Sequence, residues 1–159
     1  MEKVKIGISS CLMGNKVRYD GGDKLDRFLA DTLGRYADFV PVCPEVEMGL
    51  PVPREPMRLE GDAGKPRLVT IETDIDYTDR MTVWAEGRLS ELEKEGLCGF
   101  IFKARSPSCA VDGAAGLFAR AFMERFPMIP VVDEERLRDN GIMDEFIERM
   151  SAADRRMGR

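Results

Sequence analysis

Short apolar and β-branched runs alternate with segments of helical periodicity along this chain. The runs typical of strands cover residues 4–8, 39–42, 68–72, 99–103 and 128–132. Between and after them, apolar residues recur at spacings of three and four, which is the pattern of an amphipathic helix. Strand, helix and strand in this order predict a mainly parallel sheet covered by helices. We therefore expect an α/β fold: a single three-layer, Rossmann-like domain with helices flanking the sheet.

The helical patterns have recognisable ends. One begins at Asp76 or Thr78 and ends at Gly96, because Asp and Thr cap first turns and Gly terminates last turns. The other helical patterns cover residues 25–33, 114–122 and 133–150, the last with a break at Asn140-Gly141. The proline-rich residues 44–56 predict irregular structure. No G-x-G-x-x-G follows a predicted strand, so the pattern does not indicate dinucleotide binding.

The size and charge of the chain limit its partners. At 159 residues we expect one domain in residues 1–150, followed by a frayed tail in residues 151–159. The net charge of −5 argues against a dedicated DNA-binding or membrane-surface protein, because both need a basic excess. No run approaches the roughly 20 apolar residues of a membrane span, and the first apolar run is too short for a signal peptide. We expect a cytoplasmic protein that acts on a small molecule.

The chain contains four cysteines and no histidine. A metal or catalytic site must therefore use thiolates, carboxylates, hydroxyls or backbone groups in place of imidazole. In a reducing compartment, cysteines indicate metal binding or catalysis more than disulfides. A buried thiol can also act as a small hydrophobe, which is the interpretation we prefer for Cys98.

Three of the cysteines follow predicted strands. Cys11, Cys43 and Cys109 lie beyond carboxyl ends of strands, where open parallel sheets bind their ligands. Cys98 precedes a strand, which places it about 15–20 Å from that edge at the rise of an extended chain. The topology therefore predicts that three thiols share a crevice and that the fourth does not.

Three thiolates without histidine fit few cofactors. A structural zinc ion takes four ligands and usually two C-x-x-C pairs, which this chain lacks. An iron–sulfur cluster is held by thiolates alone. With three protein ligands, a 4Fe–4S cluster keeps one iron free to act as a Lewis acid. The residue pattern leaves open both this cluster and a three-cysteine zinc site with a free position.

Polar residues beside the cysteines are the candidates for catalysis. Glu45 follows Cys43 after a single proline, which stiffens the loop. Beside a bound metal it is the leading candidate for a general base, whereas an isolated glutamate is most often a surface charge. Ser106 and Ser108 precede Cys109 and offer hydroxyls at the same edge, although Ser-Pro is also an ordinary turn sequence.

A glycine-bounded loop carries further polar groups. Arg18, Tyr19 and Asp20 lie in this loop and could bind a substrate or form a tight turn. Ser10 has the same two interpretations. Three basic residues could supply positive charge to a cluster, although the default position of each is the solvated surface: Arg54, Lys103 and Arg105.

Three motifs carry a family resemblance. They are SSCLMGNKVRYDGG at residues 9–22, PVCPEVEMGLPVPREP at residues 41–56 and KARSPSC at residues 103–109. Together they resemble the thiouracil desulfurase (thiouracil desulfidase) family, over most of the chain from about residue 5 to residue 132. The motifs have the same order and approximate spacing as in that family.

The resemblance implies a cofactor and a reaction. It implies a 4Fe–4S cluster held by Cys11, Cys43 and Cys109, whose open iron takes the sulfur of a thiolated pyrimidine such as thiouracil. It further implies that Glu45 acts as acid and base and that Ser106 assists near the substrate. The products would be uracil and hydrosulfide, with no net redox change. The residues that we expect to contact the substrate are Ser10, Arg18, Tyr19, Asp20 and Ser108.

One segment departs from the family. Its members usually continue SPSC with glycine and a tyrosine-bearing segment, where this chain has Ala110-Val111-Asp112-Gly113. The identity of the thiolated substrate is therefore open. Two other functions also remain as alternatives: a hydro-lyase that uses an open cluster iron on a hydroxy acid, and a non-catalytic module that binds zinc or a cluster.

Overall fold

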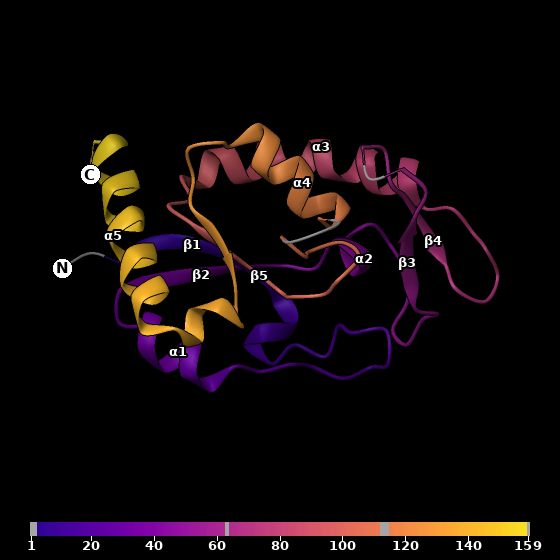
Figure 1. Ribbon diagram of the computed structural model, residues 1–159, viewed down its shortest axis with the longest axis horizontal. Coiled ribbons are helices and arrows are strands. Elements are labelled where there is room, and N and C mark those ends of the chain that lie inside the picture. The colour runs from indigo at the N-terminus through magenta and orange to yellow at the C-terminus, as the bar shows by residue number, and fades with distance from the viewer. Residues whose placement is uncertain (1–2, 63, 112–114, 159) are drawn as a thin grey trace.

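The computed structural model describes residues 3–62, 64–111 and 115–158. Its main sheet has four parallel strands in the order β2-β1-β5-β6 (Figure 1). The strands are β1 (Val4–Ser9), β2 (Ala37–Val42), β5 (Phe100–Phe102) and β6 (Val131–Asp133). Parallel neighbours are joined by crossovers that contain helices, so the expectation of a parallel α/β sheet is confirmed.

Helices cover both faces of this sheet. One core cluster joins the sheet to α1 (Arg27–Leu33) and α5 (Asn140–Arg156), and the other joins it to α3 (Thr78–Glu95) and α4 (Leu117–Arg125). Figure 1 shows α3 and α4 on one side of the strands and α1 on the other. The three-layer, Rossmann-like architecture is therefore present. A short 3₁₀ helix, η2 (Arg136–Arg138), leads from β6 into α5.

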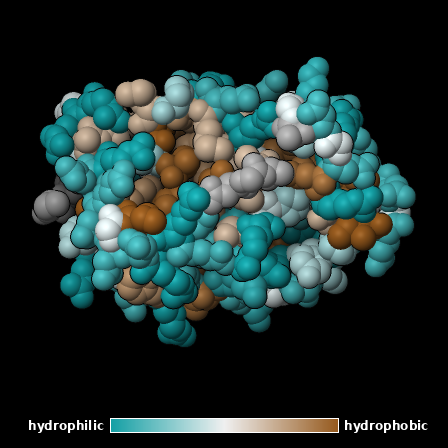
Figure 2. Space-filling view, in the orientation of Figure 1, coloured by the Kyte–Doolittle hydropathy of each residue, from teal (hydrophilic) through white to brown (hydrophobic). Residues whose placement is uncertain are grey.

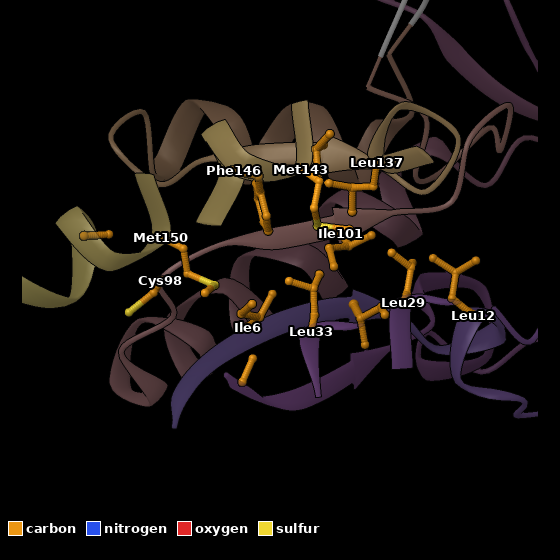
Figure 3. Packing of buried hydrophobic residues seen from close by; sticks show 14 of the residues in the cluster. Ile6, Leu12, Leu29, Leu33, Cys98, Ile101, Leu137, Met143, Phe146 and Met150 are labelled. Atoms are coloured by element: carbon orange, nitrogen blue, oxygen red, sulfur yellow. The ribbon is translucent and has the colours of Figure 1, made fainter. Parts of the chain in front are cut away.

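The side chains of β5 divide between the two layers because successive residues of a strand point to opposite faces. Ile101 belongs to the cluster under α1 and α5, which Figure 3 shows in detail. Phe100 and Phe102 point the other way, stack at 4.1 Å between ring centroids, and meet Phe118 and Phe122 of α4 edge-on. This aromatic cluster fills the layer between the sheet and α4.

Residues 44–72 differ most from the sequence-based expectation. The predicted third strand is β4 (Arg67–Thr70), but it pairs antiparallel with β3 (Met57–Glu60) in a separate two-stranded sheet. The expectation of irregular structure after Cys43 is also wrong in part, because α2 (Pro44–Glu47) forms one helical turn there. Proline is compatible with that turn because it occupies the first helical position, where its missing N–H has no intrahelical partner.

The helix ends follow local signals in some places and tertiary packing in others. Helix α3 ends at Gly96 in the left-handed conformation, as predicted. Helix α1 begins only at Arg27, and Leu25 and Phe28 are 42% exposed rather than part of its buried face. Helix α5 continues to Arg156, past the expected start of a frayed tail at residue 151, because Ala153 is buried in the core.

The surface of the fold is mostly polar. In Figure 2, hydrophilic residues cover most of the visible face, and apolar residues appear between α5 and the α3–α4 layer and near the β3–β4 hairpin. Within the described part of the chain, no helix is both long enough and apolar enough to cross a membrane. Residue 114, which the sequence placed in a helix, lies outside the described residues.

A substitution at Gly7 tests the contact between β1 and the aromatic cluster. A Cβ at this position would lie 2.2 Å from Cδ2 of Phe100, whose ring is held by its aromatic neighbours. We expect Gly7→Ala to destabilise the fold by about 1–3 kcal/mol, as overpacking does, and to lower Tm accordingly in a thermal melt. The control is Gly87→Ala in α3, where the added Cβ meets nothing within 4 Å and helix propensity improves. Equal Tm values for the two variants would contradict this packing.

Candidate functional site

A pocket of about 340 Å³ opens at the carboxyl edge of the main sheet. Three cysteines line it: Cys11 follows β1, Cys43 follows β2, and Cys109 lies on the loop after β5. All three are free thiols. In the order β2-β1-β5, β2 lies on one side of β1 and β5 on the other, so the strand order reverses at β1. Open α/β sheets bind their ligands at such a reversal. The structure therefore brings together the three thiols that the strand-end argument selected.

Cys98 lies elsewhere. It is fully buried in the apolar cluster between the sheet, α1 and α5, and does not line the pocket. Figure 3 shows Cys98 beside Met150 at one end of this cluster and Leu12 at the other end. Because Leu12 directly follows Cys11, the fourth cysteine and the pocket lie at opposite ends of the sheet.

The pocket thiols influence one another electrostatically. Burial, with a smaller contribution from the neighbouring Cys43, raises the pKa of Cys11 to about 11. Burial also raises the pKa of Cys109 to about 12, with smaller contributions from Cys43 and Cys11. The pKa of Cys43 is raised by burial as well. A protein thiol in such surroundings ionises most readily when a bound metal replaces its proton.

Glu45 enters the pocket from α2 and is held at both carboxylate oxygens. Its Oε1 accepts a hydrogen bond of 2.9 Å from Nε of Arg54, and its Oε2 accepts one of 2.9 Å from Oγ of Ser108. The side chains of Arg54 and Glu45 are 6% and 13% exposed, so the ion pair is largely shielded from water. The sequence predicted Glu45 at the site, and the structure adds the two groups that orient it.

The SPSC turn is fixed by its own hydroxyl and by helix α4. Oγ of Ser106 accepts the backbone N–H groups of Ser108 and Cys109 at 3.2 and 3.1 Å. The first N–H groups of α4 bond to carbonyls of this turn, including Phe118 N to Ser108 O at 3.0 Å. The helix approaches so closely that a Cβ on Gly116 would lie 2.3 Å from the Ser108 carbonyl carbon. The turn is therefore rigid where Ser108 and Cys109 meet the pocket.

A second ion pair borders the pocket. Nζ of Lys103 lies 3.0 Å from Oε2 of Glu134, and the two side chains are 13% and 9% exposed. Oε1 of Glu134 accepts the N–H of Ala104 at 2.7 Å, and Oγ of Ser9 accepts the N–H of Lys103 at 2.8 Å. These bonds join the last residue of β1 to the segments that follow β5 and β6. The positive charge of Lys103 also opposes the rise in the pKa of Cys11.

Three of the four polar residues predicted in or near the glycine-bounded loop line the pocket. They are Ser10, which precedes the loop, and Arg18 and Tyr19 within it. Ser10 is buried, and its Oγ accepts a hydrogen bond of 2.8 Å from Nδ2 of Asn15. Asp20 does not line the pocket, because its carboxylate accepts the N–H of Gly22 at 2.9 Å in an exposed turn. That hydrogen bond is the largest contribution that lowers the pKa of Asp20.

The basic residues do not all lie at the surface as expected. Arg54 and Lys103 are largely buried, whereas the side chain of Arg105 is 78% exposed and pairs with Glu135. Sequence reasoning missed Lys24, which lines the pocket, and Glu134. Glu134 directly follows β6, so the strand-end rule that selected the cysteines would also have selected it.

The donor set matches the chemistry of an iron–sulfur cluster, which thiolates alone can hold. Among the described residues, no three His, Cys, Asp or Glu side chains are grouped to hold a metal ion. The ligands of an iron–sulfur cluster bond to different iron atoms, so they surround a volume rather than a point. Three separate thiols around a pocket of about 340 Å³ meet that requirement. The residues present therefore fit a cluster held by Cys11, Cys43 and Cys109.

Fold and pocket define the class of protein first: a Rossmann-like α/β protein with three thiols at the ligand-binding edge of its sheet. Residues 6–134 match the family described as 2-thiouracil desulfurase, and the chain belongs to this family. The resemblance carried by the three sequence motifs is thereby confirmed.

A solved structure is also similar to the chain. It is described as a 4Fe–4S-dependent thiouracil desulfidase, TudS, and is 30% identical with a TM-score of 0.71. The similarity covers 90% of this chain and 99% of that one. No curated protein matches the chain. Residues 112 and 113, where the sequence departs from the family pattern, lie outside the described residues.

The ion pair of Lys103 and Glu134 can be tested by removing one partner. Lys103→Met leaves a buried carboxylate without its counter-ion, and we expect a loss of about 3 kcal/mol in the free energy of unfolding. Adding Glu134→Gln should recover part of this loss, because the remaining amide carries no charge. The control is Arg105→Met, which breaks an exposed pair and should cost about 1 kcal/mol or less. Urea denaturation measures all three variants, and similar losses for Lys103→Met and Arg105→Met would contradict the burial of the pair.

Proposed function

We propose that this protein removes sulfur from a thiolated nucleobase such as thiouracil, giving uracil and hydrosulfide without net redox change. The observation that carries the proposal is the meeting of Cys11, Cys43, Cys109 and Glu45 in one pocket of a chain from the 2-thiouracil desulfurase family. The similarity to a 4Fe–4S-dependent thiouracil desulfidase supports the same reaction.

Cys11, Cys43 and Cys109 would hold a 4Fe–4S cluster, with one iron free of protein ligands. When bound, this cluster supplies a thiophilic Lewis acid for the sulfur that leaves the substrate. The remaining chemistry falls to the polar residues of the pocket. They must bind the ring, activate a water molecule and transfer its protons.

Glu45 is the proposed acid and base. Attack of water on a thiocarbonyl carbon needs a base within hydrogen-bond reach, and the chain has no imidazole to provide one. An ionised carboxylate accepts hydrogen bonds at about four lone-pair sites, so Glu45 can receive a water proton while Arg54 and Ser108 hold it. The ion pair with Arg54 holds the carboxylate in place before substrate binds.

The two serines of the SPSC turn extend this arrangement. Oγ of Ser108 donates to Glu45, and Oγ of Ser106 lies 3.2 Å from Oγ of Ser108. Ser106 can therefore donate to Ser108, which gives a chain of hydroxyls that ends at the carboxylate. We propose that Ser106 assists the reaction through this chain and that Ser108 connects it to Glu45.

The rest of the pocket would bind the nucleobase. Ser10, Arg18 and Tyr19 also line the pocket, and they offer a hydroxyl, a cation and an aromatic ring. Asp20 holds the turn that carries Arg18, with its Oδ1 3.5 Å from Nε of Arg18. We therefore propose that Asp20 acts on the substrate site by fixing this loop.

Iron content tests the ligand set. After anaerobic purification and reconstitution with iron and sulfide, we expect about four irons per wild-type chain. Cys43→Ala should lose this iron because it removes a pocket thiolate, whereas Cys98→Ala should retain it. Zinc in place of iron, or a cluster that depends on Cys98, would contradict the proposed site.

Hydrosulfide release tests the acid–base role. We expect Glu45→Gln to keep its iron and to release hydrosulfide from thiouracil at least about 100-fold more slowly, because the amide cannot accept the water proton. The matched control is Glu47→Gln on the same short helix, where the amide oxygen can still accept the N–H of Cys43. It should stay within about threefold of the wild-type rate, which is well under about 1.4 kcal/mol, because Glu47 does not line the pocket. A fully active Glu45→Gln variant would rule out this role.

A further inference from the structure

We infer that Arg54 is a positioning residue that holds Glu45 and the glycine-bounded loop in one fixed arrangement. The inference rests on the proposed function, because it concerns the carboxylate to which that function assigns the proton transfer. This role depends on the planar, forked geometry of the guanidinium and not only on its positive charge. Arg54 is distinct from the groups proposed to touch the substrate.

The contacts of Arg54 reach three parts of the chain. Its Nε donates to Oε1 of Glu45 at 2.9 Å, and its Nη2 donates to the carbonyl of Val17 at 2.7 Å. Its Nη1 donates to the carbonyl of Pro51 at 3.3 Å. The backbone N–H of Arg54 donates to the carbonyl of Tyr19 at 2.8 Å. One residue thus connects α2, the proline-rich segment and the loop that carries Tyr19.

Burial makes these contacts specific. The Arg54 side chain is 6% exposed, so its donors have little access to water and depend on protein acceptors. A guanidinium is planar and presents its donors in a rigid fork, whereas a lysine ammonium is a point charge on a flexible stem. A lysine at this position could pair with Glu45 or reach Val17, but it could not reproduce the fork.

The fork also bears on the cysteine pocket. Sγ of Cys43 lies 3.9 Å from the carbonyl of Val17, which is the carbonyl that Arg54 binds. A metal-bound thiolate carries no proton to donate to that carbonyl. The bond from Arg54 would then hold Val17 in place while Cys43 serves as a ligand. Loop position and carboxylate position are therefore set by the same side chain.

Helix α2 provides a matched control. It carries a second glutamate, Glu47, whose Oε1 lies 2.9 Å from Nε of Arg88. Neither Glu47 nor Arg88 lines the pocket. The two pairs share the same helix and the same chemical groups, but only one faces the site. Arg54→Lys and Arg88→Lys keep the charge in both pairs and remove the fork in each.

The experiment compares these two variants as reconstituted enzymes. We expect Arg54→Lys to retain its iron and a KM for thiouracil within about threefold of wild type, with kcat lowered about 100-fold, as a displaced catalytic group produces. We expect Arg88→Lys to keep kcat within about threefold of wild type. A purely structural role of Arg54 would lower iron content along with kcat. That result, or an Arg54→Lys variant with more than a third of the wild-type kcat, would overturn the inference.

A double-mutant cycle measured by thermal melts tests the coupling of Arg54 and Glu45 without depending on enzymatic activity. Thermal melts of the reconstituted Arg54→Lys, Glu45→Gln and double variants should show shifts in Tm that fail to add by roughly 3–8 °C, because the two residues interact directly. Additive shifts would overturn the positioning role. If wild-type enzyme releases no hydrosulfide from thiouracil, the proposed function fails, while the cycle still decides whether Arg54 and Glu45 are coupled.

Discussion

The parallel direction of the four main strands is the constraint on which the pocket depends. Because β1, β2, β5 and β6 run the same way, the residues that follow each strand meet at one edge of the sheet. Cys11, Cys43, Cys109 and Glu134 are far apart in sequence and reach the pocket region in this way. Cys98 precedes its strand, so the same rule places it at the opposite edge, within the core.

Two ion pairs make charge available beside this pocket in a chain without histidine. A buried charge is costly unless a partner compensates it, and the pairs Arg54–Glu45 and Lys103–Glu134 satisfy that condition. Arg54 also bonds to the carbonyl of Val17 in the segment after β1, and the pair of Lys103 and Glu134 joins the segments after β5 and β6. Electrostatics and pocket shape are therefore linked, because the residues that carry these charges also connect the segments around the thiols.

Local patterns predicted individual helices and strands more reliably than they predicted which segments pair in the fold. The periodicity of the chain predicted β1, α3 and the parallel sheet, and the left-handed Gly96 marks a helix end visible in the sequence. The pairing of β3 with β4 was missed, because β3 has four residues directly after a proline-rich stretch and its pairing is not encoded by its own pattern. The burial of Arg54 was also missed, because an arginine is expected at the surface unless its buried acceptors are known.

By itself, the sequence determined that the fold is a parallel α/β sheet and which cysteines lie at its ligand-binding edge, because the alternation of strands and helices along the chain sets the direction of the strands. Only the tertiary structure decided which polar side chains reach the pocket. Ser108 rather than Ser106 contacts Glu45, because the Ser106 hydroxyl accepts backbone N–H groups of its own turn, whereas the Ser108 hydroxyl donates to the carboxylate. Asp20 lies outside the pocket because a neighbouring backbone N–H holds its carboxylate. Side-chain direction in loops depends on such contacts between distant segments, which no local pattern records.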